Sequence, residues 1–289
     1  MKKELINKYR DYLIQWLRDW FENNGKDCNA IIGISGGKDS TCVSALCVAA
    51  LGADRVIGVL MPNGEQNDIE DSYAVCRHLG IRAVEINIGG AYQNLLGQFG
   101  YQNIWASDQT KVNLAPRLRM STLYAVSQSL NGRVIGTSNL DETMLGFFTR
   151  WGDGVSDCEP IIKLHANEVV ELGLSLGVPE YLMKKAPSDG LTGSTDEQAF
   201  GFTYQEFQDF YEKMHGNVVN PVLNFEPTEK EQKMLDMCKK SDFKRKPIPE
   251  PDKYLCYYDD ITVNDPCSDC INTRGCITCT DYDQYIKGV

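Results

Sequence analysis

The stretch NAIIGISGGKDS, residues 29–40, determines the expected fold. Its first half, residues 29–34, is a short apolar run rich in isoleucine, of the kind that is buried in parallel sheets. Its second half is a turn of glycines and serines ahead of a helical stretch. Such a turn exposes main-chain N–H groups beside a helix start, which makes a binding site for anions such as phosphates. The spacing is not that of a Walker A loop, which needs four residues between its outer glycines followed by Lys-Ser or Lys-Thr.

Short apolar runs alternate with helical stretches on both sides of this turn. Runs of strand type occupy residues 29–34, 55–61, 81–87 and 133–138, and helices are expected at residues 40–51, 68–79 and 113–130. An amphipathic helix from about Leu5 to Trp20 precedes them. The alternation predicts an α/β fold with a doubly wound parallel sheet and flanking helices. Ligands bind such sheets beyond the carboxyl ends of the strands, where the Gly-rich turn lies.

The 289 residues allow one large α/β domain with an appendage. Long Gly-rich polar segments surround a helix expected at residues 166–176, and two more helices are expected at 204–216 and 227–241. A Pro-rich stretch follows. We expect a catalytic domain over residues 1–246, with a linker and a Cys-rich tail over residues 247–289.

Composition excludes several classes of partner. With 29 basic and 40 acidic residues, the formal charge of −11 offers no general attraction to nucleic acid or to anionic lipid. The N-terminus lacks the continuous apolar stretch of a signal peptide, and no window approaches the roughly 18 apolar residues of a membrane span. We therefore expect a cytoplasmic protein with no nucleic-acid partner and no membrane partner.

Asp39 is the unexpected member of the anion-binding turn. A carboxylate beside phosphates repels them unless a cation lies between, so Asp39 predicts a Mg²⁺ ion that bridges carboxylate and phosphate. Ser35 and Ser40 add hydroxyl donors, while Gly36 and Gly37 let a ligand approach the main chain closely. The structural alternative is a plain Gly-rich turn with a capping aspartate.

The motif SGGKDS, residues 35–40, resembles the pyrophosphate loop of the N-type ATP pyrophosphatases. These enzymes cleave ATP between its α and β phosphates to adenylate a substrate oxygen. Within that superfamily, the segment at 113–160, the loop KAPSDGLTGSTDEQAFGFTY at 185–204 and the basic SDFKRKP at 241–247 resemble the ammonia-dependent NAD synthetases. The likeness covers about residues 1–250 and implies a fold like that of the adenine nucleotide alpha hydrolases.

The resemblance implies a reaction. It is the ATP-dependent amidation of deamido-NAD to NAD through an acyl-adenylate, using ammonia and releasing AMP and pyrophosphate. An ammonia-dependent NAD synthetase, which is a carbon–nitrogen ligase, is therefore expected. Free ammonia is expected as the nitrogen donor because the synthetase domain begins almost at the first residue. Family members are typically homodimers, and the Trp-bearing N-terminal helix is a candidate contributor to the interface.

The resemblance also assigns roles to particular residues. Asp39 and Glu142 are the implied catalytic residues and would both hold Mg²⁺ on the ATP phosphates. The implied ATP-binding residues are Gly33, Ile34, Ser35, Gly36, Gly37, Lys38, Asp39, Ser40, Thr137 and Ser188. The implied deamido-NAD-binding residues are Arg117, Arg150, Asp157 and Lys244, whose cations suit a dinucleotide pyrophosphate and a nicotinate carboxylate. Asp153, between two glycines, is either a turn former or a functional residue.

The sequence departs from the family pattern at one lysine that usually contacts ATP. That position is Ala166 here, and Lys163 or Lys185 could substitute for the missing charge. The three histidines, His78, His165 and His215, are expected to be structural or on the surface.

Four cysteines near the C-terminus form two Cys-x-x-Cys pairs: Cys267, Cys270, Cys276 and Cys279. Four thiolates at this spacing suit tetrahedral Zn²⁺. An iron–sulfur cluster and free thiols are the alternatives. The cysteines also raise an alternative function, in which an N-type ATP pyrophosphatase modifies tRNA or a deazapurine. The net charge argues against that alternative.

Overall fold

The structure is a computed structural model that describes residues 3–184, 200–215 and 226–249. The chain divides into two units, Met1–Arg245 and Lys246–Val289. All elements and sites discussed below belong to the first unit. The four cysteines predicted to hold a metal lie outside the described residues.

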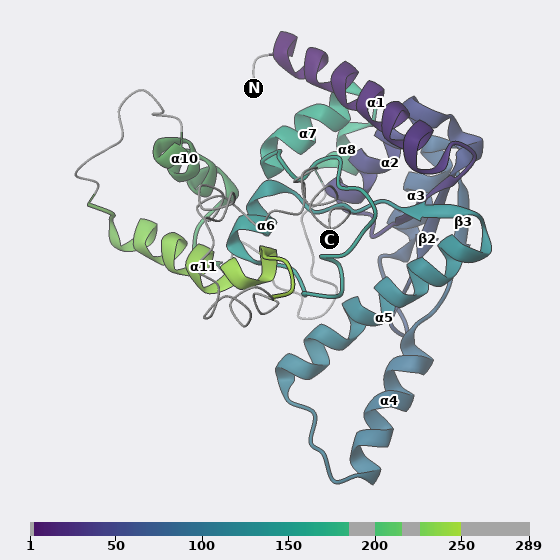
Figure 1. The fold of residues 1–289 in the computed structure, drawn as a ribbon, viewed down its shortest axis with the longest axis vertical. Coiled ribbons are helices and arrows are strands. Elements are labelled where there is room, and N and C mark those ends of the chain that lie inside the picture. The colour runs from purple at the N-terminus through teal and green to yellow at the C-terminus, as the bar shows by residue number, and fades with distance from the viewer. Residues whose placement is uncertain (1–2, 185–199, 216–225, 250–289) are drawn as a thin grey trace, which may run out of the picture. The chain divides into compact units, whose positions relative to one another are not determined.

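The first unit is built on a parallel sheet of four strands (Figure 1). The strands are β1 (Asn29–Gly33), β2 (Val56–Leu60), β3 (Arg82–Glu85) and β4 (Gly132–Val134), in the order β3-β2-β1-β4. Ile31 of β1 is paired with Ile57 of β2 on one side and with Val134 of β4 on the other. The predicted α/β fold with a parallel sheet is therefore confirmed.

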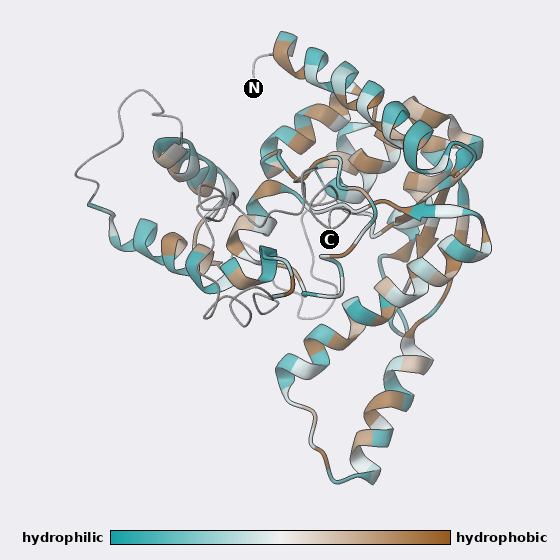
Figure 2. Cartoon of the chain, in the orientation of Figure 1, coloured by the Kyte–Doolittle hydropathy of each residue, from teal (hydrophilic) through white to brown (hydrophobic). Residues whose placement is uncertain are grey.

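Helices cover both faces of this sheet because apolar side chains point alternately to either side. Ala30 and Ile32 of β1 belong to a core formed with α1 (Lys3–Gly25), α2 (Lys38–Leu51), α3 (Ile69–Leu79), α7 (Ala166–Ser175) and α8 (Glu180–Met183). Ile31 belongs to a second core with Ala115 and Val126 of α5 (Asp108–Ser129). Figure 2 shows the hydrophobic residues gathered along the strands. The sheet is thus doubly wound, as predicted.

The apolar face of the N-terminal helix α1 packs against the core of the first unit. Leu13, Leu17 and Phe21 are buried there, and Trp16 and Trp20 pack against the same core. The two tryptophans therefore pack within this chain and help to hold α1 against the core. No helix in the described part of the chain is long and apolar enough to cross a bilayer; the cytoplasmic location stays a prediction.

A third apolar cluster lies away from the sheet. It joins α6 (Leu140–Leu145) to α10 (Tyr204–His215) and α11 (Glu229–Arg245). Aromatic rings dominate it: Phe200 stacks on Phe202 and meets Phe147 edge to face. The cluster attaches the last described helices to α6, which carries Glu142.

The order of the strands places the ligand-binding crevice. The chain runs from β1 through α2 to β2 and through α3 to β3, and then returns through α4 (Gly89–Tyr101) and α5 to β4 on the other side of β1. The connections after β1 and before β4 therefore diverge to opposite sides. In open α/β sheets such a switch point forms a crevice at the carboxyl ends of the two strands. The loop after β1 is the Gly-rich turn.

Candidate active site at the switch point

Hydrogen bonds among small residues hold the Gly-rich loop after β1. The main-chain N–H of Gly37 donates to Ser35 Oγ at 3.2 Å, and the hydroxyls of Ser35 and Ser40 lie 3.2 Å apart. Gly37 is also the N-cap of α2, so the loop runs directly into the helix start. Its main-chain N–H groups and the positive end of the helix dipole therefore lie together, as an anion site requires.

Gly36 is the position of the loop that only glycine can occupy without strain. Its φ is +77°, and a Cβ there would meet Asp71 Cβ at 3.0 Å and the Ser72 nitrogen at 3.1 Å. Gly36→Ala is therefore expected to lower the free energy of unfolding by about 1–3 kcal/mol in urea titrations. Gly37→Ala is the matched control, because φ at Gly37 is −83° and the nearest atom is a side-chain hydroxyl. Equal stability losses in the two variants would contradict this account of the loop.

Asp39 lies in the first turn of α2 with both carboxylate oxygens in polar contacts. Lys38 Nζ pairs with Oδ2 at 2.8 Å, and Asn139 Nδ2 donates to Oδ1 at 3.0 Å. Only 17% of the Asp39 side chain is exposed. The ammonium of Lys38 also lies 5.4 Å from the ring centroid of Tyr204. Asp39 is therefore a partly buried carboxylate with a cation beside it.

Asn139 connects Asp39 to Glu142. It is the N-cap of α6: its side chain accepts from the Glu142 N–H at 3.0 Å, while the Glu142 carboxylate accepts from the Asn139 N–H at 3.3 Å. Because its amide group also reaches Asp39, one residue contacts both carboxylates that were predicted to hold Mg²⁺. The ends of β1 and β4 therefore bring these two acids to one place.

The residues at this place fit a magnesium ion that is shared with phosphates. Mg²⁺ prefers oxygen ligands and is usually held by one or two carboxylates, with substrate phosphates and water completing its shell. Asp39 and Glu142 supply two such carboxylates beside an anion-binding loop. Among the described residues, no group of three or more potential metal-ligating side chains occurs, so a dedicated protein cage is not found there.

A buried ion pair joins α6 to the start of α7. Asp141 is fully buried, accepts from His165 Nδ1 at 2.5 Å and accepts from the Ala166 N–H at 2.8 Å. Burial disfavours the charged imidazolium, but the hydrogen bond and the charge of Asp141 outweigh this, and the pKa of His165 is raised overall. The pair joins α6 to the start of α7 and fixes the residue next to Glu142.

Two of the predicted deamido-NAD-binding residues meet where α5 contacts the loop that follows α6. Arg117 of α5 is exposed and reaches the carbonyl oxygen of Arg150 at 3.4 Å. The guanidinium of Arg150 lies 4.8 Å from the ring centroid of Trp151 and 5.7 Å from that of Phe243. Two cations and two aromatic rings are therefore available close together.

Asp157 is fixed to the edge of the sheet at β4. One carboxylate oxygen accepts from the Val134 N–H at 2.8 Å and the other from the Tyr124 hydroxyl at 3.1 Å. Burial and the charge of Asp157 raise the pKa of Tyr124 to about 12. This aspartate is exposed and held in one orientation.

The side chain of Lys244 caps the C-terminal end of α6. Its Nζ donates to the carbonyl oxygens of Gly146 and Phe148, both at 2.7 Å, and Arg245 donates to Thr143 and Met144. These contacts are those of a helix C-cap made by cations. Burial lowers the pKa of Lys244.

Some of the other predicted residues lie in the described part of the chain, and some lie outside it. Thr137 is partly buried just beyond β4. The Ala166 N–H is occupied by Asp141, and Lys163 is exposed, whereas Ser188 and Lys185 lie outside the described residues. Asp153 accepts from the Thr149 N–H at 2.9 Å and so closes the turn that contains it.

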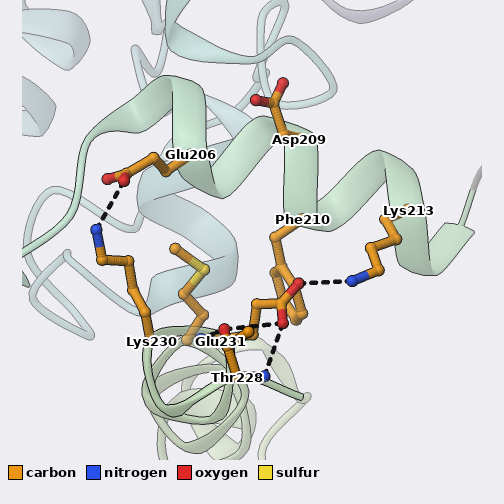
Figure 3. Close-up of a pocket in the computed structure, with 8 residues that line it drawn as sticks. Glu206, Asp209, Phe210, Lys213, Thr228, Lys230 and Glu231 are labelled. Atoms are coloured by element: carbon orange, nitrogen blue, oxygen red, sulfur yellow. Dashed lines mark hydrogen bonds and ion pairs between the residues drawn. The ribbon is translucent and has the colours of Figure 1, made fainter. Parts of the chain in front are cut away.

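A groove of about 270 Å³ lies between α10 and α11 (Figure 3). Lys230 pairs with Glu206 at 2.7 Å across it, and Lys213 pairs with Glu231 at 2.8 Å. None of the residues predicted to bind ATP or deamido-NAD lines it. Because four of its five charged side chains are paired across the two helices, we assign it to their packing.

A doubly wound parallel sheet, a Gly-rich anion loop at its switch point and two carboxylates joined by Asn139 are the parts of a nucleotide-binding enzyme that works on phosphates.

Comparison with known proteins gives the family within that class. The family model described as NAD synthase matches residues 9–248. The chain therefore belongs to the NAD synthase family. It is 40% identical over 194 residues to the NH₃-dependent NAD⁺ synthetase of Thermococcus kodakarensis, covering 67% of this chain and 75% of that one. It is 36% identical over 200 residues to the enzyme of the same name from Finegoldia magna, covering 68% and 81%.

Solved structures agree with this assignment. An NMN synthetase from Francisella tularensis superposes with a TM-score of 0.75 at 33% identity, covering 86% of this chain and 98% of that one. An NH₃-dependent NAD synthetase from Campylobacter jejuni superposes with a TM-score of 0.70 at 28% identity, covering 88% and 100%. The predicted family is thus confirmed.

Two groups in this region were not predicted from the sequence. Asn139 was missed although NLDE, residues 139–142, has the pattern of a capping box, an N-cap residue followed three positions later by Glu. The Asp141–His165 pair gave no sequence signal, because contact between two residues 24 positions apart depends on the packing of α6 against α7.

Proposed function

We propose that the crevice between the ends of β1 and β4 is where this chain amidates deamido-NAD to NAD with ATP and ammonia. The chain is a carbon–nitrogen ligase of NAD biosynthesis. The observation that carries the placement of the site is Asn139, which contacts Asp39 from one strand end and Glu142 from the next. The Gly-rich loop lies at the same strand ends.

The chemistry explains why ATP is needed. A carboxylate is a poor acyl donor because its leaving group would be oxide. The nicotinate oxygen therefore attacks the α-phosphate of ATP, pyrophosphate leaves, and ammonia then displaces AMP from the acyl-adenylate. The loop of residues 35–40, which runs directly into the start of α2, is proposed to hold the departing pyrophosphate.

Asp39 and Glu142 are proposed to hold Mg²⁺ on the ATP phosphates, where the ion would neutralise charge that builds on the leaving group. Lys38 provides a positive charge beside Asp39 within the protein itself. Arg117 and Arg150 are proposed to hold the anionic groups of deamido-NAD, supported by their position beside two exposed aromatic rings. Asp157 and Lys244 are also proposed to contact deamido-NAD.

One observation favours a second candidate substrate. The Francisella tularensis protein, with a TM-score of 0.75, is named an NMN synthetase. Its product differs from NAD by lacking the adenylate half, so the corresponding acid is nicotinate mononucleotide. Both acids present the same nicotinate ribotide to the reacting atoms. The amidation chemistry is therefore shared, and only the contacts to the adenylate half differ.

Product analysis tests the proposed function. Purified full-length protein, ATP, Mg²⁺ and ammonium are incubated with deamido-NAD or with nicotinate mononucleotide, and kcat/KM is measured for each by chromatography of the products. We expect NAD, AMP and pyrophosphate, with deamido-NAD the better substrate. A higher kcat/KM for the mononucleotide would transfer the assignment to the second candidate. Release of ADP would contradict the site chemistry.

We also propose that the chain acts as a homodimer that pairs through the tip formed by α4 and α5. These helices project beyond the sheet in Figure 1 and carry a concentration of large exposed apolar side chains. Trp105 is 91% exposed and Tyr101 80% exposed, and Leu95, Ile104 and Val112 are exposed beside them in sequence. Exposed apolar patches of this kind mark association surfaces.

Trp105→Asp is expected to convert the dimer to a monomer, because it places a charge at the most exposed aromatic residue of the tip. Sedimentation velocity at several protein concentrations measures the change. Tyr181→Asp is the matched control, since Tyr181 is 68% exposed on α8, outside the tip. A wild-type monomer, or a Trp105→Asp variant that remains dimeric, would contradict the proposed interface.

Residues 1–246 are proposed as the catalytic domain and residues 247–289 as a linker and tail. The family match, which ends at residue 248, supports this division.

A further inference from the structure

One carboxylate oxygen of Glu159 makes no hydrogen bond within the described residues, although the Ser156 hydroxyl and the Ser138 N–H both interact with the carboxylate group. Its Oε1 accepts from the Ser156 hydroxyl at 2.8 Å, but its Oε2 is buried and has no hydrogen-bond partner among the described residues. It is the one buried side-chain polar atom there in this condition. Such an oxygen costs free energy unless a donor or a cation satisfies it at some stage of function.

The carboxylate lies beside the main chain that leaves β4. A Cβ on Gly136 would fall 2.1 Å from Glu159 Oε1, so the absence of a side chain at Gly136 is what allows the carboxylate to lie there. Cys158, the preceding residue, is bridged to Ile135 and accepts from the Gly136 N–H at 2.8 Å. Glu159 is therefore fixed at the carboxyl edge of the sheet.

Glu159 lies against the same short segment of chain that carries Asn139. Residues 136–139 leave β4 with Glu159 against Gly136 and with Asp39 against Asn139. The phosphate side of the crevice thus lies at one end of this short segment and Glu159 at the other. Asp157, proposed to contact deamido-NAD, lies two residues before Glu159 on the same strand-like stretch.

Glu159 can gain and lose a proton near neutral pH. Burial raises the pKa of Glu159 to about 7, against the lowering effect of the Ser156 hydroxyl and the Ser138 N–H; the charge of Asp153 raises it further. Tyr124 of α5 and Cys158 are the other titratable groups that interact with it. The pKa of each is raised to about 12, so both are uncharged near neutrality, and it is the negative charge of Asp153 that favours a cation as partner of the carboxylate.

We propose that Glu159 binds the ammonium ion and takes a proton from it, so that ammonia is formed beside the acyl-adenylate. Ammonium is a cation with N–H donors only, which is what an unsatisfied carboxylate oxygen accepts. It keeps its protons at neutral pH, so a proton acceptor is needed before its nitrogen can attack. The inference rests on the proposed function.

The step balances in atoms and charge. One N–H bond of ammonium breaks and its proton goes to Glu159 Oε2. The freed nitrogen lone pair forms a bond to the acyl carbon, the adduct loses a second proton to solvent, and the bond from carbon to the phosphate oxygen breaks. AMP leaves as the dianion with that electron pair. Glu159 returns its proton to solvent before the next turnover.

Glu159→Gln tests the proposal, because glutamine has the shape of protonated glutamate and cannot accept the proton. With ammonium chloride at pH 8 we expect kcat/KM for ammonium to fall by about 100-fold or more, as for loss of a general base. With hydroxylamine, which is uncharged at neutral pH, we expect the rate of hydroxamate formation to change by less than about threefold. The wild-type to variant ratio with ammonium should rise with pH around a midpoint of about 7.

The outcomes separate this inference from the proposed function. Equal losses with both nucleophiles, or no loss with ammonium, would overturn the role of Glu159. Failure of wild-type protein to release pyrophosphate with deamido-NAD would instead overturn the proposed function. Ser156→Ala is a second variant: loss of a hydroxyl that lowers the pKa of Glu159 should move the midpoint to higher pH, and an unmoved midpoint counts against the proposal. Glu22→Gln, in an exposed ion pair on α1, is the matched control.

Discussion

Asp39→Asn is expected to lower kcat for NAD formation by about 10³-fold, which corresponds to about 4 kcal/mol of transition-state stabilisation. Asparagine keeps an oxygen for the contact with Asn139 but removes the charge that would bind Mg²⁺ and that pairs with Lys38. Charge on the departing pyrophosphate would then lack its counter-ion. Initial rates at saturating deamido-NAD and ammonium, measured over a range of Mg²⁺ concentrations, test this.

The partner carboxylate gives the internal check. Glu142→Gln should produce a loss of similar size, and the double variant should lose little more than either single variant, because both residues act on one ion. Asp19→Asn, an exposed change on α1, serves as the control for the loss of a charge. A decrease of less than about threefold in Asp39→Asn would remove this residue from the site, and additive losses would separate the two carboxylates.

Asp141→Asn is expected to lower the free energy of unfolding by about 3–5 kcal/mol, as breaking a buried ion pair generally does. Asp141 accepts from both His165 Nδ1 and the Ala166 N–H. Asparagine has one acceptor oxygen, so one buried donor loses its partner and faces an NH₂ group. Urea unfolding followed by circular dichroism measures the change. A loss below about 1 kcal/mol would mean that the pair contributes little.

The pH dependence of stability provides a second readout of this pair. The pKa of His165 is raised in the folded protein, so its contribution to stability is fully present below the unfolded value of about 6.5 and is lost as the pH rises through the folded value. The free energy of unfolding of the wild type should therefore fall over that window. The Asp141→Asn variant should show a smaller fall. An identical pH profile in both would contradict the assignment of this titration to the pair.

Most of the fold could be predicted because its strands are fully buried runs separated by turns. The strand at 29–34 and the Gly-rich turn after it could be predicted from neighbouring residues alone. A continuous short apolar run followed by glycines is typical of a strand that is buried on both faces. Helix α4 was missed for a physical reason: glycines at 89, 90, 97 and 100 hide its helical pattern. Helix α5 begins earlier than predicted, at Asp108, because the side chain of Ser107 caps it there.

The candidate site was predictable only in part. Asp39 stood out because its charge is wrong for a phosphate loop unless a cation is present, a contradiction visible in the sequence itself. Glu159 did not stand out, because the buried state of one of its oxygens depends on Gly136, which lies on a different strand end. Nor could the sequence show that the tryptophans of α1 face the core while Trp105 is exposed. Such facts arise from packing between distant segments.

In the proposed reaction, the acid is joined to ATP through the α-phosphate before ammonia attacks. The most direct measurement uses deamido-NAD labelled with ¹⁸O in both carboxylate oxygens, with mass spectrometry of all products after a single turnover. We expect one ¹⁸O atom in AMP, one in the amide of NAD and none in pyrophosphate. Label in pyrophosphate or in inorganic phosphate, with none in AMP, would contradict it.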